Sequence, residues 1–485
     1  MLVKNSLLYG SMSIIRGILA FLVVTVYTRL LPPADYGDYA ILIALIGFFD
    51  SFAFMAIRHA IMRHITHTEK ETDLSYLANA LTLYVAGAAL CIAIVFIALQ
   101  FEFINRMENS DLLFFLGLMV AAEAFAQLVI IMARIRLKNK LFFALNLLRS
   151  LLSVSMGSVL IVSGMGLMGA VYAFIFSALV TCALGIWGAP DLKNISVSLV
   201  NRKIIREILT FSLPLVLVLS IQSAVTITDR LLLDYMIGQD ITGLYAAAQD
   251  VPWRLINMLI IAIHIAAYQL AVNKLDHEGE EACKAQLHQN YTLLFGLGLP
   301  ATIGIIMLAP GLANLFLGEK FRQFFIDFVV FFAPLAFLNS FLQHYFILSF
   351  NFVKKNHMMI VPFCGALAIK LIVGYIGISH FGVMGAIVAS YMAYIFLLFS
   401  AVVLARPVFR MPVPWLPTIQ IIVSCAIMAI VLYILDLGPD IMSLLISVMI
   451  AVCIYGASIY CMNTGNIRAE IKKLRAHDIA GKSLI

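Results

Sequence analysis

The stretch "GLMGAVYA" at Gly166–Ala173 returns as "GVMGAIVA" at Gly382–Ala389, 216 residues later. Both copies read Gly-x-Met-Gly-Ala-apolar-x-Ala, and each stands at the start of a long apolar run. One copy alone is ambiguous, because small residues at this spacing occur wherever two transmembrane helices pack closely. Two copies at matched positions favour an internal repeat.

A second pair of similar stretches supports the repeat. "GDYA" at Gly37–Ala40 resembles "GLYA" at Gly243–Ala246, 206 residues later. Each is preceded by an arginine and leucines, "RLL" at Arg29–Leu31 and "RLLL" at Arg230–Leu233. The two spacings differ by ten residues, so the sequence predicts two related halves with small insertions.

The composition is that of a membrane protein. Hydrophobic residues make up 63% of the 485 residues and charged residues 12%, whereas a soluble domain carries about 25% charged residues. A soluble core could not bury so much apolar surface, so lipid must cover a large part of it. The seven cysteines show no ligand or disulfide spacing, and we expect no metal site and no cofactor.

Fourteen apolar runs are each long enough to cross about 30 Å of hydrocarbon. Their approximate cores are 7–29, 36–57, 75–98, 112–133, 142–163, 167–189, 209–235, 243–271, 290–309, 328–350, 358–379, 383–405, 416–436 and 442–462. Loops on the cytoplasmic side of a membrane are enriched in lysine and arginine. With a cytoplasmic N-terminus, 23 of the 32 basic residues fall on that side and 5 on the other. The sequence therefore predicts both termini in the cytoplasm.

The repeat assigns six helices to each half, with two more appended. Because six is even, both halves have the same orientation, and a pseudo-two-fold axis along the membrane normal is expected to relate them. The predicted fold is an all-α polytopic membrane protein of about 14 transmembrane helices. Its parts are an N-terminal lobe at 1–190, a cytoplasmic linker at 191–208, a C-terminal lobe at 209–405, two additional transmembrane helices at 406–462 and a basic cytoplasmic tail at 463–485.

Two motifs resemble those of a known family. "RLLPPADYGDYA" at Arg29–Ala40 is similar to the Arg-x-Leu-x-Pro-x-x-Tyr-Gly-x-Tyr pattern of the polysaccharide transporter family. "LFLGEKF" at Leu315–Phe321 is similar to a second stretch of that family. The family belongs to the multidrug/oligosaccharidyl-lipid/polysaccharide flippase superfamily. The resemblance implies a flippase of the bacterial inner membrane that moves undecaprenyl-pyrophosphate-linked oligosaccharide outward for cell-surface polysaccharide biosynthesis.

Charged residues inside the apolar runs are the candidate site. An ionised side chain in mid-bilayer costs about 2.5–3.5 kcal/mol, so such residues are expected to face the bundle interior or a wet cavity. Arginine and lysine suit a pyrophosphate, which arginine can bind with paired hydrogen bonds. The candidate cargo-binding residues are Arg16, Arg149, Arg254 and Lys370; the candidate coupling or charge-pair residues are Asp50, Glu123, Asp250 and Asp229.

Simpler roles remain open for several of these residues. Asp250 and Arg254 are four residues apart and can neutralise each other on one helix. Asp229 can pair with its neighbour Arg230 at a helix end. The chain has no Walker A pattern, so the sequence leaves a proton gradient, a sodium gradient and the membrane potential open as energy sources.

Three functions compete with the flippase. A cation-coupled multidrug antiporter of the same superfamily requires a cavity dominated by acids. A membrane glycosyl-polymerase requires catalytic groups on a large loop, and His264 and His344 stand isolated within apolar runs. A purely structural membrane protein leaves the buried charges unexplained. We therefore expect a transporter and not an enzyme, acting as a monomer on lipid-linked oligosaccharide among membrane lipids, beside a polysaccharide polymerase, with no nucleic acid as partner.

Overall fold

The computed structural model describes residues 19, 21–64, 70–98, 110–136, 138–188 and 196–468. These residues form helices and connecting turns and no β-strand, which confirms the all-α prediction for the described part of the chain. The helices are α2 (Pro33–Phe49), α3 (Ala56–His64), α4 (Lys70–Ala98), α5 (Ser110–Ile135), α6 (Asn139–Leu160), α7 (Gly166–Gly188), α8 (Arg202–Met236), α9 (Gln239–Glu278), α10 (Glu280–Met307), α11 (Ala309–Phe316), α12 (Glu319–Phe341), α13 (Leu348–Phe352), α14 (Ile360–Phe381), α15 (Val383–Ala405), α16 (Trp415–Leu435) and α17 (Ile441–Met462).

Three π-helical turns interrupt these helices within the described residues. They cover Asp50–Met55 between α2 and α3, Ile161–Met165 between α6 and α7, and Leu342–Phe346 between α12 and α13. A π-helical turn inserts one residue into a helix and changes the direction of the side chains that follow. The first and third turns carry Asp50 and His344, two titratable residues inside apolar helices.

The helices agree with the predicted spans. Twelve helical segments of the described chain are long and apolar enough to cross a membrane. One of them, Asn139–Gly188, is 50 residues long and contains two of the predicted spans, in α6 and α7. Of the first predicted span, 7–29, the structure describes mainly the apolar helix Phe21–Leu30. The chain is therefore a multi-pass membrane protein.

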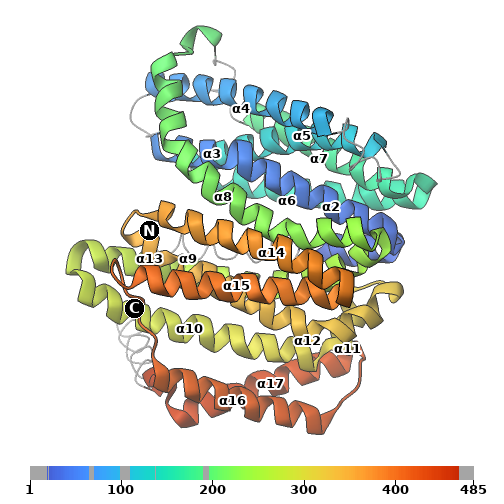
Figure 1. Cartoon of the computed structure of the whole chain (residues 1–485), viewed down its shortest axis with the longest axis vertical. Coiled ribbons are helices and arrows are strands. Elements are labelled where there is room, and N and C mark those ends of the chain that lie inside the picture. Colours follow the sequence, from blue (N-terminus) through green and yellow to red (C-terminus); the bar gives the residue numbers. More distant parts are fainter. Residues whose placement is uncertain are drawn as a thin grey trace, which may run out of the picture. The chain divides into compact units, whose positions relative to one another are not determined.

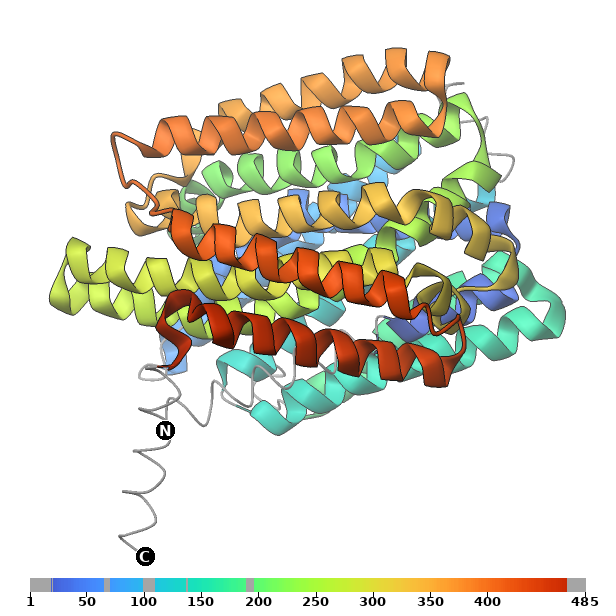
Figure 2. The same cartoon turned by 90° about the horizontal axis from the view of Figure 1, so that it is seen from below.

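The described residues form two compact units. Unit A contains the described residues up to Ala246 together with Lys355–Leu397, and unit B contains Ala247–Lys354 and the described residues from Leu398 onward. In unit A, α5 packs against α4 and α7, and α8 packs against α2, α3 and α14 (Figure 1). In unit B, α10 packs against α12 and α16, and α16 and α17 run side by side (Figure 2). The lobe and linker boundaries given above stay a prediction.

The repeated Gly-x-Met-Gly motif forms the same backbone turn twice within unit A. Gly166 has φ 51° and ψ −136°, and Gly382 has φ 55° and ψ −131°. Residues with a Cβ rarely adopt this conformation, so both positions favour glycine. Each turn joins two packed helices, α6 to α7 and α14 to α15.

The second glycine of each motif lets those two helices approach closely. A Cβ on Gly169 would lie 2.9 Å from the backbone nitrogen of Ile161, and a Cβ on Gly385 would lie 2.0 Å from the carbonyl carbon of Gly377. Ile161 and Gly377 are themselves 216 residues apart, the same spacing as the motifs. The repeated sequence therefore encodes one helical hairpin in two copies.

The second pair of similar stretches brings the two halves of the sequence into direct contact inside unit A. A Cβ on Gly37 in α2 would lie 2.4 Å from the carbonyl oxygen of Gln239, and a Cβ on Gly243 in α9 would lie 1.9 Å from the carbonyl oxygen of Pro33. Gln239 stands four residues before Gly243, as Pro33 stands four before Gly37. The contact is therefore reciprocal between equivalent positions, as a two-fold axis requires.

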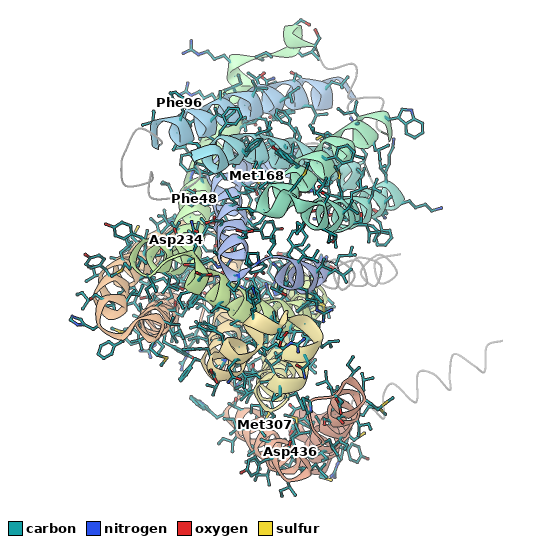
Figure 3. All side chains as sticks on the ribbon, turned by 90° about the vertical axis from the view of Figure 1, so that its right-hand side faces the viewer. Phe48, Phe96, Met168, Asp234, Met307 and Asp436 are labelled. Carbon is teal, nitrogen blue, oxygen red and sulfur yellow. The ribbon has the colours of Figure 1, made fainter. Side chains whose placement is uncertain are left out.

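Apolar side chains cover much of the outer surface. Phe96 projects outward from α4 (Figure 3), with 64% of its surface exposed. In α17, Met449 is 68% exposed, whereas Ala451 is buried against Met428 of α16. Such large exposed apolar groups on long helices indicate a surface that lipid covers.

The Gly37–Gly243 contact generates the first prediction. Gly37→Ala and Gly243→Ala each place a methyl group against a backbone carbonyl, and we expect each to destabilise the protein by about 1–3 kcal/mol, the usual cost of overpacking. The measurement is the thermal unfolding midpoint of the purified protein in detergent. Gly47→Ala is the matched control, because a Cβ on this glycine of α2 meets nothing within 4 Å. Equal midpoints for Gly243→Ala and Gly47→Ala would contradict the contact.

Candidate functional site

Asp50 and Arg58 form a two-pronged ion pair in unit A. The Arg58 guanidinium donates to both carboxylate oxygens of Asp50, at 2.7 and 2.5 Å. The side chains are only 11% and 19% exposed. Eight residues separate the pair, and the π-helical turn between α2 and α3 lies between them. Charge-assisted pairs of this geometry are among the strongest hydrogen bonds in proteins.

Arg58 is a residue that the sequence interpretation missed. The second predicted span ends at residue 57, which places Arg58 in a cytoplasmic loop. The structure continues the helical segment to His64, so Arg58 belongs to the interior of a span of 32 residues. The eight-residue spacing to Asp50 carries no simple signal, since residues in a regular α-helix meet at spacings of three or four.

Glu123 and Arg149 form a second ion pair between α5 and α6. The Arg149 guanidinium donates to one carboxylate oxygen of Glu123, and the Gln127 amide donates to the other at 2.9 Å. The Arg149 guanidinium also lies over the Phe174 ring of α7, 5.5 Å from its centre. Asp50 is close enough to act electrostatically on Arg149. The structure thus gathers Asp50, Arg58, Glu123 and Arg149 into one charged cluster, which we call the N-terminal cluster.

Asp229 and Lys370 form the most deeply buried ion pair of the described chain. The Lys370 ammonium donates to the Asp229 carboxylate at 2.6 Å and to the backbone carbonyl of Val225 at 2.9 Å. The side chains are 1% and 3% exposed. This pair links α8 to α14, which pack against each other in unit A.

Two hydroxyl groups complete the surroundings of Asp229. Ser390 of α15 donates to the carboxylate at 2.6 Å, and Tyr245 of α9 donates to it at 3.2 Å. The ammonium also lies 5.5 Å from the ring centre of Tyr394. A carboxylate with three donors and an ammonium with two oxygen partners satisfy the condition for burying a charge pair. In this conformation the pair holds helices together, and Lys370 is not open to a cargo.

Asp250 and Arg254 pair on α9 in unit B. The guanidinium donates to the carboxylate at 3.1 Å, and the two residues stand one helical turn apart on either side of Pro252. The side chains are 18% and 31% exposed. Mutual neutralisation on one helix, one of the roles left open above, is therefore the geometry in the structure.

The structure thus places every described candidate residue in an ion pair. Glu123 pairs with Arg149, Asp229 with Lys370 and Asp250 with Arg254, while Asp50 pairs with Arg58. Arg16 lies outside the described residues. In this structure Arg149, Arg254 and Lys370 each face an acid, so an anionic cargo would have to displace that acid to reach the base. Their role in cargo binding stays a prediction.

Comparison with known proteins identifies the family. Residues 26–326 match the sequence profile of a family described as polysaccharide biosynthesis protein. The chain belongs to this family. The match covers more than half of the chain and confirms the resemblance inferred from "RLLPPADYGDYA", whose glycine is Gly37 of the α2–α9 contact. No curated protein sequence matches the chain significantly.

Solved structures show the same fold. The first is a lipid II flippase, MurJ, in an inward closed conformation, with a TM-score of 0.75 at 14% identity over 95% of this chain and all of that one. An inward-facing multidrug resistance transporter of the MATE family has a TM-score of 0.62 at 16% identity, covering 81% of this chain and 95% of its own. A transporter of the same superfamily from Pyrococcus furiosus has a TM-score of 0.56 at 16% identity, covering 83% and 95%.

These likenesses confirm the predicted fold class of a two-lobed, all-α membrane protein. Since the identities lie at 14–16%, they establish the fold alone.

The Asp229–Lys370 pair generates the second prediction. Lys370→Met leaves a buried carboxylate without its cation, and we expect a loss of about 3–5 kcal/mol, the usual cost of breaking a buried pair. The double variant Asp229→Leu with Lys370→Met removes both charges and should recover most of that loss. Thermal unfolding of the three proteins in detergent is the measurement. A double variant no more stable than Lys370→Met would show that the ion pair is not the origin of the effect.

Proposed function

We propose that this protein is a flippase that moves undecaprenyl-pyrophosphate-linked oligosaccharide from the cytoplasmic to the outer leaflet of the bacterial inner membrane. It works by alternating access and serves the synthesis of a cell-surface polysaccharide. The match of residues 26–326 to the polysaccharide biosynthesis family carries this proposal. The proposal includes the expected topology, with both termini in the cytoplasm, and a monomer that works beside a polysaccharide polymerase.

The fold supports a transporter of lipid-linked cargo. The structure with the highest TM-score among those named above is that of a lipid II flippase, and the likeness covers 95% of this chain. The multidrug transporters of the superfamily cover 81–83% of it. The extent of the likeness therefore favours the flippase over the multidrug antiporter, the main alternative function. The named structural neighbours are transporters, which supports a role other than that of an enzyme.

The N-terminal cluster is the described site best suited to cargo. Its side chains are 11–19% exposed, whereas those of Asp229 and Lys370 are almost completely buried. An arginine can exchange its carboxylate partner for a pyrophosphate, because both present pairs of oxygens to the planar guanidinium. Arg58 and Arg149 can therefore release Asp50 and Glu123 when an anion enters, and Arg16 remains a candidate of the same kind.

The direct test is a flipping assay in liposomes, and it generates the third prediction. Purified protein is reconstituted with undecaprenyl-pyrophosphate oligosaccharide, and the exposure of the sugar to an enzyme outside the vesicle is followed over time. We expect Arg149→Ala and Arg16→Ala each to slow flipping at least about tenfold, since a hydrogen bond to a charged group contributes about 1.5–3 kcal/mol. Lys320→Ala, at an exposed position of α12, is the control and should flip at the native rate.

Two outcomes decide between the candidate functions. Native protein that flips the sugar lipid, with slower arginine variants, supports both the function and the site. Native protein that moves no sugar lipid but exchanges an organic cation for protons would overturn the flippase in favour of the antiporter. Thermal unfolding of each variant separates loss of transport from loss of folding.

A further inference from the structure

Two histidines that lie 80 residues apart in the sequence meet inside unit B. His264 is on α9, and His344 is in the π-helical turn Leu342–Phe346. Their ring centres are 4.8 Å apart, with an angle of 78° between the planes. Both residues are partly buried, and both lie in helical segments long and apolar enough to cross the membrane. The sequence interpretation of two isolated histidines was therefore wrong.

The π-helical turn determines where the His344 ring points. The backbone amide of Ile347 donates to the carbonyl of Leu342, five residues earlier, at 3.0 Å. In a regular α-helix this bond would reach back four residues. The inserted residue rotates this part of the helix and places the His344 ring against α9. π-helical turns of this kind occur frequently at functional sites.

The hydrogen bonds fix the tautomer of His344. Its Nδ1 lies 2.8 Å from the backbone carbonyl oxygen of Ser340. A carbonyl oxygen only accepts, so Nδ1 must carry the proton and Nε2 of the neutral ring has an open lone pair. No residue of the described chain donates a hydrogen bond to that Nε2. His344 is therefore arranged to accept a proton rather than to complete a network.

Burial disfavours a charge on either imidazole, and two neighbouring groups offset part of that cost. The backbone carbonyl of His344 interacts with the His264 ring, and the Tyr268 ring stacks on the same ring at 5.6 Å. Carbonyl dipoles and the face of an aromatic ring both stabilise a positive charge. Two charged imidazoles at this distance repel each other strongly, because water screens them little inside a membrane protein. The pair can therefore accept one proton but not two at once.

The other titratable groups near the pair are tyrosines. Tyr268 belongs to α9, and Tyr345 of the π-helical turn directs its hydroxyl to the carbonyls of Leu287 and Pro412. Among the described residues, no carboxylate, lysine or arginine forms an ion pair with either histidine. The charge of the pair thus depends on the two imidazoles themselves.

We propose that His264 and His344 form a single proton-binding site within the membrane, and that this proton is loaded and released during the transport cycle. The second clause rests on the proposed function. The site would make the proton gradient the energy source, among the three that the sequence left open. Proton binding would change the hydrogen bonding at the π-helical turn, and this change could shift α13, which follows the turn directly.

The first test measures proton binding without any cargo. Full-length protein labelled with nitrogen-15 histidine is placed in lipid nanodiscs, and the imidazole signals are followed from acid to alkaline pH. Coupled rings titrate as a pair rather than as two sites. We expect His344→Gln to change the titration of His264, and His264→Gln to change that of His344. His380→Gln, at an exposed position of α14, is the control and should change neither.

The second test, which is the fourth prediction, measures the pH dependence of flipping in the liposome assay. We expect native flipping to vary at least about tenfold with pH, and the double variant His264→Gln with His344→Gln to vary less than about twofold, because neither neutral amide can titrate. Thermal unfolding confirms that the variants are folded. His264 and His344 that titrate independently, or not at all, overturn the proton site. If the two histidines titrate as a coupled pair but flipping does not depend on pH, the proton site stands and its role in transport is overturned. If the native protein flips no sugar lipid, the proposed function is overturned, and the titration alone decides the proton site.

Discussion

The structure depends on the need to neutralise charge in a low-dielectric interior. A membrane helix can carry an ionised side chain only if a partner or water compensates for its lost hydration. In the described chain this compensation comes from ion pairs: Asp50 with Arg58, Glu123 with Arg149, Asp229 with Lys370, and Asp250 with Arg254. Three of these pairs lie in unit A: Asp50 with Arg58 bridges the turn between α2 and α3, Glu123 with Arg149 joins the consecutive helices α5 and α6, and Asp229 with Lys370 joins α8 to α14, which lie far apart in the sequence. Charge pairing therefore selects which helices pack together, as well as making each helix tolerable in lipid.

The ion pairs differ in how easily their members can exchange partners. Asp229 and Lys370 are held by hydroxyl and carbonyl groups from α8, α9 and α15 and are shielded from solvent, so they act as a fixed link. The N-terminal cluster retains some exposure and a π-helical turn, and its arginines have the geometry to exchange one anion for another. The proposed transport cycle requires both kinds of contact, because rigid parts must move against each other around groups that change partners.

Close packing by glycine is the second constraint. In lipid, apolar side chains gain little free energy by packing against another helix instead of against lipid. Small residues that let two helix backbones approach closely therefore become important for helix association. Gly37 and Gly243 provide one such contact, and Gly169 and Gly385 provide two more. These positions lie in the repeated motifs, so the internal symmetry of the sequence and the closest backbone contacts of unit A share one origin.

The sequence by itself determined that this is a membrane protein, where its spanning helices lie, and that it contains an internal repeat. Hydropathy and the need for glycine at a turn or close contact are local properties of the chain, so the sequence shows them directly. It also identified the family through "RLLPPADYGDYA". The sequence also offered the pairing of Asp250 with Arg254, four residues apart on one helix. Only the tertiary structure showed that Arg58 lies inside a span, that Lys370 pairs with Asp229, and that His264 meets His344. Each of these depends on a π-helical turn or on the packing of helices that are distant in sequence, and neither leaves a periodic signal along the chain.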